Sequence, residues 1–65
     1  MLNATEKKLL DKVLEVTGDR EEAIRDGIVK ALRGENDKAR RGYLWRILSR
    51  AAKHRIRAAR QKYQV

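Results

Sequence analysis

The sequence has no cysteine, no proline and only one histidine. Without cysteine the chain has no disulfide framework and no cysteine-based zinc site, and His54 cannot form a metal site alone. A chain of 65 residues buries only about 60% of its unfolded surface. A domain this small, without disulfides or metals, relies on well-packed helices or on oligomerisation. We therefore expect one domain over residues 1–65, with no metal and no other cofactor.

Long apolar runs are also missing. No stretch approaches the roughly 18 apolar residues of a transmembrane helix, and no apolar signal-peptide segment follows Met1. The composition is rich in Ala, Leu, Glu, Lys and Arg, which favour helices, and strand-type alternation is absent. The sequence predicts an all-α, cytoplasmic protein that does not associate with membranes. We expect a small three-helix domain with a long basic C-terminal helix.

The first expected helix covers residues 4–17. Asn3 and Glu6 form a capping-box pattern at its start, in which each side chain bonds to the backbone of the other residue. Gly18 follows as the favoured residue just past a helix end. Side chains at helical spacing define the face that is predicted to join the core: Leu9, Leu10, Val13, Leu14 and Thr17.

The second expected helix covers residues 20–33. It starts with another capping-box pattern, Asp19 to Glu22, and ends at Gly34. Gly27 lies on the apolar stripe of this helix. It indicates either the close approach of another helix or a glycine that the helix tolerates at a cost of about 1 kcal/mol. The rest of the stripe is Ala23, Ile24, Ile28, Ala31 and Leu32.

The third expected helix covers residues 38–62, after an N-cap at Asn36 or Asp37. At about 1.5 Å per residue it spans about 37 Å. Its end should therefore project beyond the other helices or pack against a second chain. Gly42 is a candidate break between a first basic turn and the rest. The apolar face comprises Leu44, Ile47, Leu48, Ala51, Ala52, Ile56, Ala59 and Tyr63.

Positive charge is concentrated in the third expected helix. Residues 1–37 contain seven basic and nine acidic side chains, a net charge of −2, whereas residues 38–65 contain ten basic side chains and no acidic one. Such a polarised chain favours a polyanionic partner. Five cations step by three or four positions along one side, and a second cluster precedes them: Arg46, Arg50, Lys53, Arg57 and Arg60, then Lys38, Arg40 and Arg41.

Nucleic-acid binding through phosphate contacts is the function that this pattern predicts, with the steep salt dependence of counterion release. The main alternative is a protein-interaction module that self-associates or binds an acidic partner, and a designed helical bundle is another. A calmodulin-type target or a helix bound to an anionic membrane surface fits less well, because the distal apolar face is mostly alanine. Catalysis is not expected, because no acid in this half of the chain completes a catalytic group with Ser49, Lys53 and His54.

Two aromatic residues lie near the start of the basic helix. Tyr43 and Trp45 are two positions apart, so they point about 200° away from each other around the helix. Either one is a candidate to stack on a base or to contact a partner protein. The favoured interpretation makes Trp45 the largest residue of the core.

Two stretches of the chain match a family pattern. One runs Glu22-Ala-Ile-Arg-Asp-Gly-Ile-Val-Lys-Ala-Leu32, and the other runs Tyr43-Leu-Trp-Arg-Ile47 with a basic run after it. Over about residues 18–61 they resemble the second conserved region of bacterial sigma factors, especially the extracytoplasmic-function type. Where that family has Gln-Glu-x-Phe, this chain has Arg-Asp-Gly-Ile.

The resemblance implies two partners. In sigma factors the first of these helices docks on RNA polymerase, and the second helps to melt and read promoter DNA. Carried over, Glu22, Arg25 and Asp26 would face polymerase, and the basic helix with Tyr43 would face DNA, which favours DNA over RNA. Two shorter stretches are similar to an RNA-binding ribosomal-subunit protein (residues 37–42) and to Fis-type helix-turn-helix domains (residues 10–23), which keeps an RNA- or ribosome-binding function open.

Overall fold

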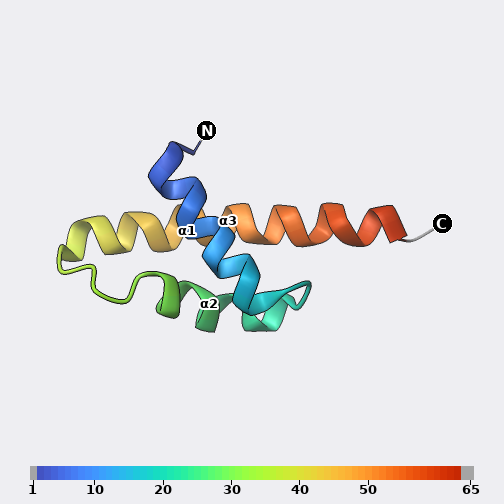
Figure 1. The fold of residues 1–65 in the computed structure, drawn as a ribbon, viewed down its shortest axis with the longest axis horizontal. Helices are drawn as coiled ribbons and strands as arrows, with labels where there is room; N and C mark the ends of the chain where they lie inside the picture. The colour runs from blue at the N-terminus through green and yellow to red at the C-terminus, as the bar shows by residue number, and fades with distance from the viewer. Residues whose placement is uncertain (1, 64–65) are drawn as a thin grey trace.

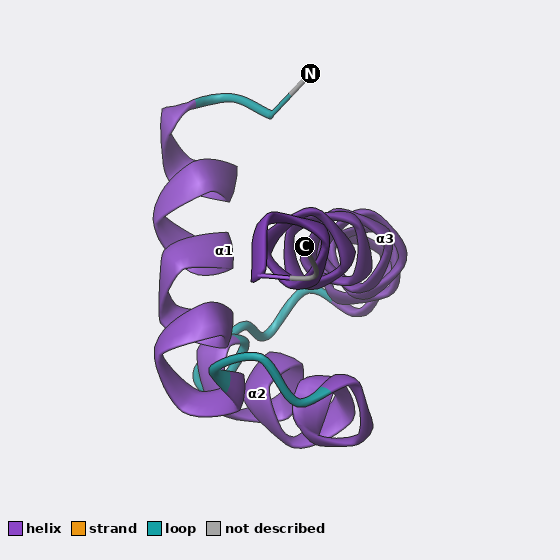
Figure 2. Ribbon diagram, turned by 90° about the vertical axis from the view of Figure 1, so that its right-hand side faces the viewer, coloured by secondary structure: helices purple, strands orange, loops and turns teal. Residues whose placement is uncertain are grey.

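The computed structural model describes residues 2–63, except for the side chain of Tyr63. These residues form α1 (Ala4–Thr17), the short 3-10 helix η1 (Glu21–Ala23), α2 (Ile24–Ala31) and α3 (Lys38–Tyr63), and they contain no strand. The all-α prediction and the long third helix are therefore confirmed. α1 crosses the middle of α3, while α2 runs back along its first half (Figure 1). Seen along α3, α1 and α2 lie on two adjacent sides of this helix. No described element covers the remaining sides of α3 (Figure 2).

α1 begins and ends where the sequence predicts. The Asn3 side chain accepts a hydrogen bond from the backbone N–H of Glu6 at 2.8 Å, and the Asn3 N–H donates to Glu6 Oε1 at 3.0 Å. These two bonds satisfy donors that a helix start otherwise leaves without partners. At the other end, the Gly18 N–H donates to the Leu14 carbonyl at 2.7 Å. Gly18 has φ 58°, a left-handed conformation that glycine adopts without steric cost.

The start of the second helix differs from the prediction. The capping box at Asp19 does not form: Arg20 occupies the N-cap position without a side-chain cap, and the first turn is the 3-10 helix η1. The reason is the tight turn after α1, in which the Arg20 N–H donates to the Thr17 carbonyl at 3.1 Å. Asp19 is held inside this turn. α2 proper covers only Ile24–Ala31, and a turn over residues 32–34 replaces the rest of the expected helix.

Asp37, one of the two predicted caps, is the N-cap of α3. The Asp37 carboxylate accepts hydrogen bonds from the backbone N–H groups of Ala39 at 3.0 Å and Arg40 at 3.3 Å. The helix continues without a break through Gly42, so the predicted separation of a first basic turn is wrong. It spans 26 residues at about 1.5 Å each, which accounts for the 43 Å length of the molecule. Its last turns project past α1 and α2, as predicted (Figure 1).

The core joins one face of each helix. Most of the predicted apolar positions are buried, and Leu9, Leu14, Ile47 and Ala51 pack at the edge of this core. Tyr63, which was expected to extend the apolar face of α3, has its side chain outside the described part of the structure. The fully enclosed apolar residues are Leu10, Val13, Ile24, Ile28, Leu32, Leu44, Leu48, Ala52 and Ile56.

Gly27 is the point of close approach between α1 and α2. A Cβ atom added at this position would lie 2.7 Å from Thr17 Cγ2, 3.0 Å from the Val13 carbonyl oxygen and 3.2 Å from Val13 Cγ1. The carbonyl belongs to the backbone of α1, so the helix itself would have to move. Of the two interpretations of Gly27, the close approach of another helix is confirmed.

We predict that Gly27→Ala destabilises the protein by about 1–3 kcal/mol, because the added methyl group overpacks the α1–α2 contact. The measurement is the midpoint of urea denaturation at unchanged m-value. Combining it with Thr17→Ser, which removes the nearest methyl group, should recover part of the loss.

Gly42→Ala is the matched control, since nothing lies within 4 Å of a Cβ added there. Alanine in an exposed helix is more favourable than glycine by about 1 kcal/mol, so this variant should gain stability. Equal effects of the two substitutions would contradict the close approach at Gly27.

Candidate nucleic-acid interface

The cations predicted to contact phosphate lie on the solvent side of α3. All eight are exposed: Lys38, Arg40, Arg41, Arg46, Arg50, Lys53, Arg57 and Arg60. The basic row Arg46, Arg50, Lys53, Arg57 and Arg60 starts two positions after the buried row Leu44, Leu48, Ala52 and Ile56, and its members point about 100–180° away from the middle of that buried row. Burial of the apolar row therefore turns the basic row to solvent.

The distal part of this basic row also contacts the turn between α1 and α2. Arg57 Nε lies 3.3 Å from Glu21 Oε1, and an Arg60 guanidinium N–H donates to the Asp19 carbonyl at 3.1 Å. The Arg57 side chain remains 67% exposed, so an ion pair of this kind contributes at most about 1 kcal/mol. These contacts hold the C-terminal half of α3 against η1, and they leave Arg57 and Arg60 less available to an external anion.

The remaining cations of the row are Arg46, Arg50 and Lys53, which we call the open strip. Within the described residues, no carboxylate pairs with any of these three side chains. In the cluster at the start of α3, Arg40 pairs with Glu35 at 3.3 Å, while Lys38 and Arg41 have no such pair among the described residues. Among the described residues, three of the eight predicted cations thus have a polar side-chain contact and five have none.

The two aromatic residues flank the open strip on different sides. Trp45 is 36% exposed and Tyr43 is 54% exposed, so the interpretation of Trp45 as a core residue is wrong. Leu44 and Leu48 already fill the core at this level, and Trp45, one position after Leu44, is turned toward α2. Trp45 lines two neighbouring hollows. Ile28 and Ser49 also line the first, and Val29 also lines the second.

The residues predicted to face RNA polymerase lie on the outer side of η1 and α2. Glu22, Arg25 and Asp26 are all exposed. Glu22 and Arg25 line a hollow of about 300 Å³ together with Trp45 and Lys53 of α3, whereas Asp26 does not reach it. The polymerase-facing and DNA-facing sets of the sequence analysis therefore meet at this groove rather than on separate faces.

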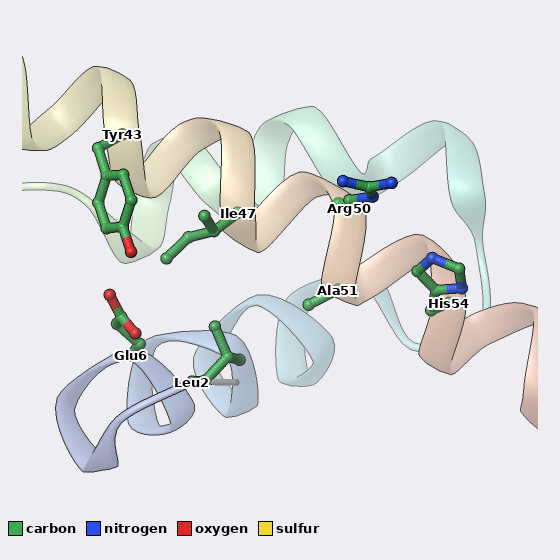
Figure 3. A pocket seen from close by; sticks show the side chains of 7 residues that line it. All are labelled: Leu2, Glu6, Tyr43, Ile47, Arg50, Ala51 and His54. Atoms are coloured by element: carbon green, nitrogen blue, oxygen red, sulfur yellow. The ribbon is translucent and has the colours of Figure 1, made fainter.

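A second hollow, of about 310 Å³, lies between the start of α1 and α3, and sequence reasoning missed it. Its lining comes from both elements, and Figure 3 shows the side chains: Leu2, Glu6, Tyr43, Ile47, Arg50, Ala51 and His54. Glu6 is only 6% exposed. Its spacing of four and seven positions before Leu10 and Val13 places it on the buried face of α1, and this signal could have revealed it.

Other kinds of site are not found in the described part of the chain. Among residues 2–63, no group of three His, Cys, Asp or Glu side chains is placed to hold a metal ion. None of the described helices combines the length and the apolar character needed to cross a membrane.

Comparison with models of known protein families, with curated proteins and with solved structures found no match. The resemblance to sigma factors stays a prediction that rests on residues 22–32 and 43–47. The function must be argued from the surface of α3 and the hollows beside it.

We predict that Trp45, the single tryptophan, is readily quenched by acrylamide in the native protein. Iodide should quench it more than caesium, because the protein carries a net charge of +8 and Trp45 lies on a helix whose charged residues are all positive. The difference should shrink at high salt, where charges are screened. Resistance to all three quenchers would place the ring in the core and contradict the structure.

Proposed function

We propose that the protein binds nucleic acid through the open strip of α3, with Arg46, Arg50 and Lys53 contacting phosphates. The observation that carries the proposal is the exposure of these three cations on one side of a helix that contains no acidic residue. Successive members are about 6 Å and about 4.5 Å apart along the helix axis. A rigid helix therefore presents them as a continuous row to an extended polyanion.

Electrostatic repulsion within α3 supports the same function. The segment from Lys38 onward carries ten basic side chains, and only Arg40 and Arg57 among the described ones have a carboxylate within 4.0 Å. The like charges that remain destabilise the folded state, and a bound polyanion relieves this repulsion. Ligand binding to the native state also raises its stability by mass action. An external chain of phosphates would neutralise the positive charge of the strip.

DNA is favoured over RNA as the ligand, and a role in transcription is proposed on the same grounds. The preference comes from the resemblance of residues 18–61 to a sigma-factor region, in which the corresponding helix faces promoter DNA. Phosphate contacts supply affinity without reading sequence. Arginine side chains of the strip can also bond to guanine in a groove, which offers a route to base recognition.

We predict that replacing the open strip by glutamine (Arg46→Gln, Arg50→Gln and Lys53→Gln together) weakens DNA binding and its salt dependence. Each lost phosphate contact lowers the slope of log K against log salt by about 0.9 for duplex DNA. The slope should fall by about two to three in fluorescence anisotropy titrations at several salt concentrations.

The matched control replaces three exposed lysines of α1, Lys7, Lys8 and Lys12, by glutamine. Its net charge changes by the same amount, so long-range attraction falls equally while the strip stays intact. An equal loss of slope in both variants would show that net charge, rather than the strip, drives binding.

Protein binding is a second candidate function, favoured by one apolar patch. Val29 is 56% exposed and lies with Trp45 in a hollow of about 450 Å³ that also includes Arg33, Glu35 and Arg41. Adjacent apolar side chains with charged groups around them are typical of interaction sites. The patch suits an apolar side chain of a partner or of a second copy of this chain.

This second function predicts a concentration-dependent dimer or a stable complex that depends on the patch. Val29→Glu should abolish the association in light scattering, because it places a charge at the centre of an apolar contact. The exposed Val16 of α1 is the matched position for a control variant, Val16→Glu. If the protein stays monomeric at all concentrations, self-association through this patch is excluded. The patch could then bind only a different partner protein.

A further inference from the structure

We propose that the hollow between the start of α1 and α3 holds one unpaired base of a single-stranded nucleic acid, and that Glu6 selects bases with an amino group. This inference rests on the proposed function, because Arg50 belongs both to the open strip and to the wall of the hollow. A strand held by the strip therefore passes the mouth of the hollow. Leu2 and Glu6, which complete it, lie outside the segment that resembles sigma factors.

The shape and lining of the hollow suit a planar aromatic ring. Its volume is about 310 Å³, and Leu2, Ile47 and Ala51 give it apolar surface. Tyr43 stands at one end (Figure 3), and the residue is 54% exposed. Stacking of a base on an aromatic side chain contributes about 1–3 kcal/mol. The apolar contacts accept the ring of any base, so they provide affinity without selection.

Selection comes from the Glu6 carboxylate. Its Oε1 atom accepts the hydrogen bond from the Asn3 N–H at 3.0 Å, and in Figure 3 the carboxylate points across the hollow toward the Tyr43 hydroxyl. An ionised carboxylate only accepts hydrogen bonds. It pairs with the exocyclic amino group that cytosine, adenine and guanine carry, as carboxylates do with cytosine in DNA complexes. Uracil and thymine have no amino group, and their single N3–H donor lies between two carbonyl oxygens that would face the negative charge.

The charges along the hollow are arranged like those of a nucleotide. Glu6 lies near one end, beside Tyr43, while Arg50 and His54 lie toward the other end on α3 (Figure 3). A nucleotide with an amino-bearing base has a hydrogen-bond donor at its base edge and a negative phosphate at its opposite end. The donor edge therefore meets the acid, and the phosphate meets the arginine. A ligand that is anionic throughout would not fit this arrangement.

The base must be unpaired to enter. In a duplex the amino group of cytosine or adenine is engaged in the base pair, and the ring is stacked inside the helix. Proteins that place a base in a pocket act on single strands or take the base out of the stack, at a cost of a few kcal/mol. A hollow of this size between two protein helices admits a single base and excludes a duplex. Single strands are therefore the preferred ligand of this site.

The test compares single-stranded oligonucleotides of dC and dU of equal length, which differ in the base edge while ring size stays constant. Fluorescence anisotropy at low salt and slightly alkaline pH should show about tenfold tighter binding of dC, given the discrimination that hydrogen-bonded readout provides. A duplex of mixed sequence should bind more weakly than dC at the same salt concentration.

Glu6→Gln is the decisive variant. Glutamine is as good a capping-box residue as glutamate, so the α1 start is preserved, and circular dichroism should show an unchanged fold. The amide brings an N–H donor into the hollow, so the preference for dC should vanish or turn toward dU. Retention of the full dC preference in Glu6→Gln would overturn the selection by Glu6.

Tyr43 provides a second, independent variant at an exposed position. Tyr43→Leu should weaken binding of both oligonucleotides about tenfold through the loss of stacking, with the salt slope unchanged, whereas Tyr43→Phe should bind like the native protein. Equal binding of dC and dU, or tighter binding of duplex, would overturn this inference and leave the proposed function in place. Absence of salt-sensitive binding to any of these ligands would overturn both.

Discussion

Burial of one apolar row of α3, from Leu44 to Ile56, is the constraint on which the rest of the structure depends. The row must contact both α1 and α2, and this fixes the rotation of the long helix about its own axis. Arg46, Arg50 and Lys53 are then left exposed to solvent. Each buried branched side chain contributes about 1.5–3 kcal/mol, which outweighs any exposed ion pair. Packing, rather than electrostatic attraction inside the chain, therefore determines where the positive charge is presented.

Four acidic residues of the first half of the chain make contacts at helix ends and turns. Glu6 belongs to the capping box of α1 and Asp37 caps α3, while Glu21 pairs with Arg57 and Glu35 pairs with Arg40. All four contacts lie near the ends of elements, where carboxylates also interact favourably with the positive end of a helix. None reaches the middle of α3. The charge of the open strip is consequently not balanced from within the described chain, although the first half carries a net negative charge.

The sequence predicts features that depend on neighbouring residues better than features that depend on residues far apart in the chain. The bounds of α1 and the cap of α3 depend on residues three or four positions apart, so Asn3, Glu6 and Asp37 revealed them. The capping pattern at Asp19 was equally good locally, but the turn that joins α1 to η1 places Arg20 at the N-cap position instead. Trp45 was misplaced because size and apolar character do not show whether a core is already full. The hollow at Glu6 requires residues 2 and 54 to meet, and no local pattern contains that information.

The open strip separates two hollows of different chemistry. On the α1 side, Tyr43 and Glu6 combine an aromatic ring with a hydrogen-bond acceptor, whereas on the α2 side Trp45 and Val29 form an apolar patch with mixed charges at its edge. The two rings point about 200° apart around α3, so a ligand on one side does not cover the other. Nucleic-acid binding and protein binding are therefore compatible on this helix. A nucleic acid held at Tyr43 and Arg50 would leave the patch at Trp45 open, and the rigid α3 would hold both partners at a fixed relative orientation.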